Sequence, residues 1–179
     1  KRRNNIFRTK IFEKKFSQKL GSKFSVCCSS GTAAGTLALM ALGIGKGDEV
    51  ILQSFTFIAA IESILMTGAT PIIVDTDETL GMCPKDLQKK ITKKTKCIMP
   101  VHMLGKSCNM DEIKKISKIN KIPIVEDACE ALGVKYKKKS LGTIGEIGFF
   151  SFDFGKIITT GEGGMLTTNS KDLFIKLKA

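Results

Sequence analysis

Residues 149–156 read Phe-Phe-Ser-Phe-Asp-Phe-Gly-Lys, and residues 157–164 continue Ile-Ile-Thr-Thr-Gly-Glu-Gly-Gly. An apolar, aromatic run of this kind predicts a buried strand. The run ends on Lys156, which has no charged residue within two positions on either side. Burial disfavours the charged form of a lysine, and a neutral amine can form a Schiff base with a carbonyl. Lys156 is therefore a candidate catalytic residue; the alternative is a strand-end lysine whose ammonium group reaches water.

Outward from this stretch, segments typical of strands alternate with segments typical of helices. We expect helices over residues 5–20, 31–42, 56–67, 84–91 and 110–119, and a last helix capped by Ser170. We expect strands over residues 24–28, 50–53, 71–74, 96–101, 122–125, 147–152 and 163–168, with a turn-rich segment at 133–145. This alternation predicts one α/β domain of three layers, αβα, with a mainly parallel sheet that is covered on both faces.

In such a sheet, ligands bind at the carboxyl ends of the strands. The run Ser29-Ser30-Gly31-Thr32-Ala33 follows the strand at 24–28 and leads into a helix. Small residues let a ligand approach the backbone closely, and a helix N-terminus offers free N–H groups to a phosphate. Neither GxxxxGK[ST] nor a GxGxxG after a strand is present. The turn is a candidate phosphate site, and helix capping is the alternative.

Two further strand ends carry residues that suit a planar, cationic ligand. Glu126-Asp127 ends the strand at 122–125, where a carboxylate either caps a helix or pairs with a cationic ring nitrogen. Phe57 follows the strand at 50–53, and it either packs in the core or stacks on a planar ligand. A phosphate turn, a stacking aromatic residue, a strand-end aspartate and a pocket lysine together meet the needs of pyridoxal phosphate (PLP).

The chain is strongly basic, with 29 lysines and arginines against 17 aspartates and glutamates and a formal net charge of +12. Such a charge raises nucleic acid as a partner. However, nearly all of the basic residues are lysines spread over expected helix faces and turns, and one tyrosine without any tryptophan makes a poor stacking platform. We expect a solvated basic surface and no nucleic-acid partner; a non-catalytic basic binding module remains the rival function.

The cysteines and the apolar segments exclude other classes of protein. Six cysteines show no CxxC spacing and His102 is the single histidine, so no metal site is expected. The uncharged stretch 24–45 is broken by glycines, serines and threonines, which favours strand, turn and helix over a membrane span. No secretory signal is visible, and we expect reduced thiols, a cytoplasmic location and no membrane partner.

In their order and spacing, these motifs resemble the DegT/DnrJ/StrS family of sugar aminotransferases, a branch of the fold-type I PLP enzymes. The matching segments are 30–33, 41–45, 47–50, 68–71, 100–102, 126–128, 150–152 with Lys156, and 159–164. Each segment is a weak signal alone, whereas the set is specific. The resemblance covers nearly the whole chain from residue 6.

The resemblance implies a role for each matching position. Lys156 would hold PLP through a Schiff base and then move the substrate proton, and Asp127 would keep the pyridine nitrogen protonated. The other cofactor-binding residues would be Gly31, Thr32 and Ala33 with the Ser151 hydroxyl at the phosphate, Phe57 against the ring face, and Glu130 near the phenolic oxygen.

Four polar positions are less securely assigned by the resemblance. Glu130 stands where many relatives have glutamine, and a carboxylate beside a phenolate is repelled unless it is protonated. Asp153 occupies a variable position and receives no role. Glu162 is expected to be structural, and His102 is either near the mouth of the site or a satisfied structural histidine.

The family further implies an activity and an assembly. We expect a PLP-dependent aminotransferase that transfers an amino group from glutamate to a nucleotide-linked keto-sugar. The reaction would belong to polysaccharide or amino-sugar biosynthesis. The rival within the fold is a PLP-dependent sugar dehydratase, whose lysine is replaced by histidine. Family members are longer homodimers, so residues 1–179 would be part of the PLP-binding large domain without the small C-terminal domain. We therefore expect the strand at 147–152 and the helix after Ser170 to expose apolar surface.

Overall fold

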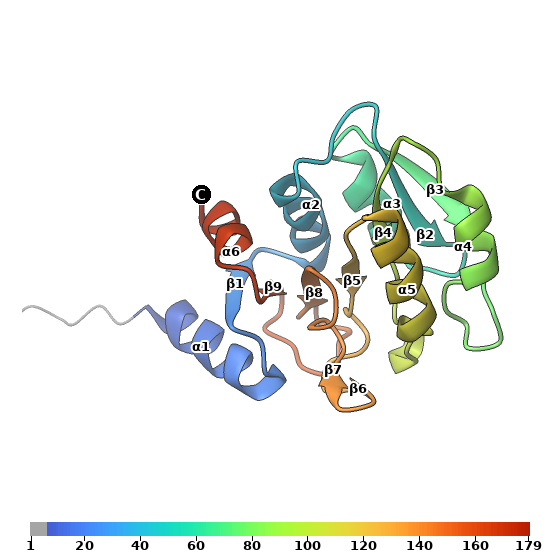
Figure 1. Ribbon diagram of the computed structural model, residues 1–179. Coiled ribbons are helices and arrows are strands. Elements are labelled where there is room, and N and C mark those ends of the chain that lie inside the picture. Colours follow the sequence, from blue (N-terminus) through green and yellow to red (C-terminus); the bar gives the residue numbers. More distant parts are fainter. Residues whose placement is uncertain (1–6) are drawn as a thin grey trace, which may run out of the picture.

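The structure is a computed structural model that describes residues 7–179. A central sheet lies between two layers of helices (Figure 1). The helices are α1 (Arg8–Leu20), α2 (Gly31–Ala41), α3 (Ile58–Leu65), α4 (Pro84–Lys90), α5 (Met110–Asn120) and α6 (Lys171–Lys178), with a 3-10 turn at Met103–Gly105. Within the described range no helix is long and apolar enough to cross a membrane.

The strands follow the expected positions closely. They are β1 (Phe24–Cys28), β2 (Glu49–Gln53), β3 (Thr70–Val74), β4 (Thr95–Met99), β5 (Val125–Asp127), β6 (Lys135–Tyr136), β7 (Lys139–Ser140), β8 (Ile147–Ser151) and β9 (Gly164–Thr168). The first part of the helix expected over 5–20 lies outside the described residues. The strand expected over 122–125 starts later, at Val125, because Lys121 ends α5 in a left-handed conformation and Ile124 makes only an isolated bridge to β4. The turn-rich segment at 133–145 contains the small hairpin β6–β7.

The strand order confirms a mainly parallel sheet. One part has the order β1-β9-β8-β5 and the other β3-β2-β4. Parallel bridges from Ile98 to Ile124 and from Val101 to Asp127 join β4 to β5, so the two parts form one sheet. All strands of the sheet run in one direction except β9, which is antiparallel to both of its neighbours, β1 and β8. The carboxyl ends of the parallel strands therefore lie along one edge.

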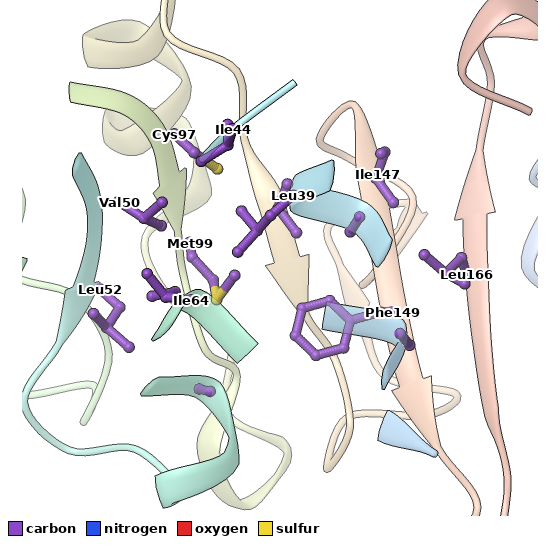
Figure 2. Close-up of a cluster of buried hydrophobic side chains, with 14 of the residues drawn as sticks. Leu39, Ile44, Val50, Leu52, Ile64, Cys97, Met99, Ile147, Phe149 and Leu166 are labelled. Carbon is purple, nitrogen blue, oxygen red and sulfur yellow. The ribbon is translucent and has the colours of Figure 1, made fainter. Parts of the chain in front are cut away.

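Alternate residues of each strand face opposite helix layers, as the twofold period of a strand requires. On one face, Val50, Met99 and Phe149 pack with Leu39 of α2 and Ile64 of α3 (Figure 2). The opposite face packs in two clusters. One, with α4 and α5, contains Ile51, Ile98 and Ile113; the other, with α1, contains Phe16, Phe150 and Met165.

The strand at 147–152 is buried, as its apolar run predicts, and the expectation that it exposes apolar surface is wrong. Phe149, Phe150 and Phe152 are each at most 2% exposed, because α2 covers one face of β8 and the Phe16 ring of α1 packs on Phe150 at 5.1 Å. The expectation for the last helix holds in part. Phe174 of α6 stacks on Phe24 at 4.6 Å, whereas Ile175 is 56% exposed.

Candidate active site

The carboxyl ends of β1, β5 and β8 surround a cavity of about 280 Å³. Its walls come from the turn before α2, the start of α3, the segments after β4 and β5, and the loop after β8. Seven of the eight site residues expected from the sequence line it: Gly31, Thr32, Phe57, Asp127, Glu130, Ser151 and Lys156. Ala33 does not line the cavity.

The turn before α2 offers an anion site. Ser30 caps the helix, and its hydroxyl accepts the Ala33 amide at 3.1 Å, so this amide is already engaged. For the Thr32 amide the described residues provide no hydrogen-bond partner. A Cβ on Gly31 would lie 2.8 Å from Cβ of Ser151 and 3.2 Å from its hydroxyl oxygen. Glycine therefore leaves the space between the turn and Ser151 that a phosphate would fill.

Asp127 ends β5 with its carboxyl group on the cavity side of the sheet. The residue is 6% exposed, and Oδ1 accepts the Cys129 amide at 3.0 Å. Burial raises the pKa of Asp127, although this hydrogen bond and the nearby Lys156 ammonium oppose the rise. A cation placed in the cavity would restore the ionised form, which is the behaviour required of a partner for a protonated ring nitrogen.

Glu126, the neighbour of Asp127, points to the other face and belongs to a hydrogen-bond network that the sequence did not reveal. It is fully buried, and its two oxygens accept three amides, from Gly142 at 3.0 Å, Ile144 at 2.6 Å and Gly145 at 2.7 Å. His102 Nε2 lies 3.2 Å from the same carboxylate. Glu126 thus joins β5 to the loop that precedes β8.

His102 lies near the site, as one expectation had it, and it is also a satisfied structural histidine, as the other had it. Its side chain is fully buried and lines the cavity. The Cys108 amide donates to Nδ1 at 3.3 Å, so Nε2 carries the proton and donates it to Glu126. The His102 amide donates to the Asp127 carbonyl at 2.9 Å. Through these bonds His102 fixes the segment beside Asp127.

Lys156 lies five residues beyond the end of β8, in a loop over the cavity. The isolation inferred from its sequence neighbours does not hold in space, because Nζ lies 3.8 Å from Oε1 of Glu130. The side chains of Lys156 and Glu130 are 21% and 29% exposed. Nζ also lies 5.7 Å from the centre of the Phe57 ring, within the range of a cation–π contact.

Two acidic residues without an assigned role help to shape this loop. Oδ2 of Asp153 accepts the Gly155 amide at 3.2 Å, and the Asp153 carbonyl accepts the Lys156 amide at 3.0 Å. The Asp153 turn therefore presents Lys156. The backbone carbonyl of Glu162 accepts a hydrogen bond from the Thr160 hydroxyl at 2.6 Å, and Glu162 lines the cavity. The loop is held by its own polar contacts.

Sequence reasoning missed Cys129, which lines the cavity two residues after Asp127. The signal was its position, because residues two apart at a strand end tend to face the same side. Its sulfur would lie 3.2 Å from a Cβ on Gly31. Burial raises the pKa of the Cys129 thiol well above its usual value. The thiol is therefore neutral and does not compete with Lys156 as a nucleophile.

These residues fit PLP group by group. A helix N-terminus with a free amide and the Ser151 hydroxyl suit a phosphate, Phe57 offers an aromatic face, Asp127 offers a carboxyl group, and Lys156 offers an amine. No group of three or more histidine, cysteine or acidic residues that could hold a metal ion occurs in the described part of the chain. The amine, the carboxyl group and the aromatic face suit an organic cofactor.

Comparison with known proteins assigns the chain to a family. The model of the DegT/DnrJ/EryC1/StrS aminotransferase family matches residues 7–179. The chain is 47% identical over 168 residues to GDP-perosamine synthase of Caulobacter vibrioides, covering 93% of this chain and 45% of that protein. It is 49% identical over 164 residues to GDP-perosamine synthase of Escherichia coli O157:H7, covering 91% of this chain and 45% of that protein. The chain thus spans less than half the length of these relatives.

Solved structures agree with this assignment. The aminotransferase from Psychrobacter cryohalolentis superposes with a TM-score of 0.93 at 43% identity, over 95% of this chain and 44% of that one. A putative sugar aminotransferase from Streptococcus pneumoniae, described in its PLP-form, gives a TM-score of 0.91 at 33% identity, over 96% of this chain and 49% of that one. The chain belongs to the DegT/DnrJ/EryC1/StrS aminotransferase family, and PLP is the cofactor of this family.

Proposed function

We propose that this member of the DegT/DnrJ/EryC1/StrS family supplies the cofactor site of a PLP-dependent aminotransferase that acts on a nucleotide-linked keto-sugar. One observation carries the proposal. Lys156, Asp127, Phe57 and the Thr32 amide all line a single cavity. An amine, a buried carboxyl group, an aromatic face and an anion site at one place meet the requirements of the cofactor, and a basic binding surface needs none of them.

Each residue has a task in the proposed reaction. PLP supplies an electron sink that stabilises negative charge at the substrate carbon next to the amino group. Nζ of Lys156 would hold the cofactor and, once free, would remove the proton from that carbon. Asp127 would hold the ring nitrogen in its protonated form from a site that is 6% exposed, where a charge pair is stronger than in water.

Glu130 positions the amine. Its Oε2 accepts the Leu104 amide at 2.8 Å while Oε1 faces Nζ of Lys156 at 3.8 Å. Leu104 has φ of 54°, a left-handed conformation that costs free energy in a residue other than glycine. The Glu130 bond stabilises this conformation. The carboxylate therefore connects the reactive lysine to the segment after β4.

The substrate class is taken from the relatives. Two proteins that share 47% and 49% identity with this chain are described as GDP-perosamine synthases, and perosamine is an amino sugar. We infer a nucleotide-linked keto-sugar as the acceptor and glutamate as the donor, in the formation of an amino sugar for a polysaccharide. A third relative, a spore coat polysaccharide biosynthesis protein of Bacillus subtilis at 44% identity, supports this direction.

A dehydratase on the same fold is the second candidate. A solved GDP-4-keto-6-deoxymannose-3-dehydratase matches this chain with a TM-score of 0.88 at 34% identity. The residue at position 156 favours the aminotransferase, because an amine can hold the cofactor between turnovers whereas the histidine expected in a dehydratase cannot form a Schiff base.

We further propose that the enzyme is a homodimer. Near the cavity, Phe154 is 81% exposed, Ile157 is 79% exposed and Leu104 is 67% exposed. Ile157 and Leu104 line a second cavity of about 270 Å³ that shares Lys156 and Glu130 with the first. Grouped apolar side chains at the edge of a site are typical of a surface that another subunit covers.

The test uses the full-length protein loaded with PLP. Incubation with glutamate should convert the cofactor to its amine form, and GDP-4-keto-6-deoxymannose should then return it to PLP with formation of a GDP-linked amino sugar. Mass spectrometry of the sugar measures the second step. A product that has lost water and gained no nitrogen would support the dehydratase instead, and the absence of both reactions with a range of keto-sugars would contradict the proposal.

A further inference from the structure

A group of lysines around a second concave surface has no part in the proposed reaction. Lys114, Lys115, Lys118 and Lys121 of α5 and its C-terminal cap line a cavity of about 710 Å³. Its floor includes residues 122–124, which precede β5, so it lies at the amino end of that strand, whereas Asp127 lies at the carboxyl end. This cavity is separate from the site at Lys156.

The charges at this cavity are unbalanced. Within residues 7–179, no carboxylate oxygen lies within 4.0 Å of Nζ of these four lysines. The two acidic residues at its rim are already engaged, since Asp111 pairs with Lys137 at 2.6 Å and Glu146 accepts the Ile124 amide at 2.6 Å. The C-terminal dipole of α5 supplies only about −0.5 of a charge. The four ammonium groups therefore have no direct carboxylate partner, and the lining, with four lysines against Asp111 and Glu146, is net positive.

A second group of lysines extends the positive surface. The hairpin β6–β7 contributes Lys137, Lys138 and Lys139 to an adjoining cavity of about 360 Å³, which shares Lys114 and Asp111 with the first. The ion pair between Lys137 and Asp111 fastens the hairpin to α5. Because the two cavities share residues, we treat their lining as one positive surface and call it the lysine groove.

We propose that the lysine groove binds a small polyphosphate anion, an extended ligand with several phosphate groups in a row. Lysine acts as a point charge that binds phosphate without demanding a fixed geometry, which suits successive phosphates. A nucleic acid fits less well, because the single aromatic residue here, Tyr136, is half-buried and already has the Lys137 ammonium 5.7 Å above its ring. No base-stacking platform is left at the groove.

The experiment titrates inorganic tripolyphosphate into the full-length protein by calorimetry, with saturating PLP to occupy the cavity at Lys156. The wild type should bind one equivalent, with an affinity that falls as salt is raised. The variant Lys114→Ala/Lys118→Ala should bind roughly tenfold more weakly or worse, the effect of losing hydrogen bonds to a charged ligand. Both substitutions lie in a helix and replace exposed side chains, so the fold should persist, which circular dichroism checks.

The matched control is Lys85→Ala/Lys89→Ala on α4, which has the same spacing and charge change but lies outside the groove. It should bind tripolyphosphate like the wild type. Equal losses in both variants would show diffuse attraction and overturn the proposal, as would the absence of saturable binding. Replacing tripolyphosphate by a nucleoside triphosphate or by pyrophosphate distinguishes the source of the phosphates. Tight binding to DNA or to anionic vesicles that tripolyphosphate cannot displace would also overturn it.

Discussion

Glu126 and Asp127 are adjacent in β5 and point to opposite sides of the sheet, and their carboxyl groups differ in how many hydrogen bonds the protein gives them. Glu126 is fully buried and accepts three amides and His102, so both of its oxygens are satisfied by the protein. Asp127 is nearly as buried, accepts one amide, from Cys129, and faces a cavity. A buried carboxylate is costly unless its charge is balanced by hydrogen bonds or a partner.

The difference indicates that Glu126 stabilises the fold, whereas its neighbour Asp127 serves the proposed site. The Glu126 side joins β5 to the loop before β8 and holds the frame in place. The Asp127 side retains an unmet need for a cation, and the PLP ring nitrogen would meet it. Substitutions on the Glu126 side should therefore lower the free energy of unfolding, whereas substitutions on the Asp127 side should lower turnover with little cost in stability.

The largest effect is expected at Lys156, which lies on the Asp127 side. Lys156→Ala should reduce turnover of the full-length enzyme by several orders of magnitude, because the covalent attachment and the proton carrier are lost together. Lys156→Arg keeps the positive charge near Glu130 and should be equally inactive. Lys15→Ala on α1 is the control and should have normal turnover. Steady-state kinetics that gave Lys156→Ala near-normal turnover would contradict the assignment of Lys156 as the catalytic lysine.

On the other side of the strand, Glu126→Gln should destabilise the fold. One carboxylate oxygen becomes an amide NH₂ that faces further donors among the Gly142, Ile144 and Gly145 amides and His102. Leaving such buried donors unsatisfied should cost about 3 kcal/mol. Urea unfolding measures the loss, and the exposed Glu78→Gln variant provides the control. An unchanged midpoint would mean that Glu126 does not hold the loop.

The third prediction concerns Asp127, where a substitution should lower turnover and leave stability intact. Asp127→Asn should slow turnover roughly a hundredfold, which corresponds to about two pKa units of lost ring protonation. The raised pKa of Asp127 means that the folded state holds its proton more tightly than the unfolded state. The stability from this group is present below the unfolded pKa and is lost as pH rises through the folded pKa.

Asparagine does not titrate, so the Asp127→Asn variant does not lose this stability as the pH rises. Without cofactor at pH 7, its free energy of unfolding should therefore equal or exceed that of the wild type. Denaturant curves at pH 4 and pH 7 measure the difference. A variant that was as unstable as Glu126→Gln, with turnover intact, would show that the two sides of β5 do not differ as described.

The smallest effect is expected at the phosphate turn. Gly31→Ala places a methyl group 2.8 Å from Cβ of Ser151, so either the turn or β8 must shift. A steric cost of about 1–3 kcal/mol should weaken PLP binding by roughly tenfold or more. The control is Gly45→Ala, where the nearest atom is 3.6 Å away. Equal PLP affinity in both variants, measured by fluorescence titration, would remove the turn from the site.

The fold was predictable because it depends on local signals. Alternating apolar segments placed the helices and strands, and Ser170 caps α6 as expected, its hydroxyl accepting the Leu173 amide at 3.3 Å. The apolar run predicted the burial of β8 correctly, whereas the expected exposure of its surface was wrong, since its cover comes from α1 and α2, more than a hundred residues earlier in the sequence. The strand's own residues indicate that it is buried, but they do not indicate which elements cover it.

The site was predictable to the extent that strand ends gather at one edge of the sheet. Asp127 and the turn at Gly31 were placed together in this way, whereas Ser151 was proposed through the family resemblance; all three line one cavity. The surroundings of each group were not, because they depend on distant partners. Glu130 lies 26 residues before Lys156 and pairs with it, and the amides bound by Glu126 lie 16–19 residues beyond it. The sequence pattern could not tell the satisfied carboxylate from the open one.

The most direct test of the cavity on the Asp127 side asks which lysine carries the cofactor. The full-length protein is incubated with PLP, reduced with borohydride, digested, and mapped by mass spectrometry. The structure predicts one label per chain, on the peptide that contains Lys156, and no label at that peptide in Lys156→Arg. Labels spread over the many surface lysines, or a single label on any other lysine, would contradict the assignment.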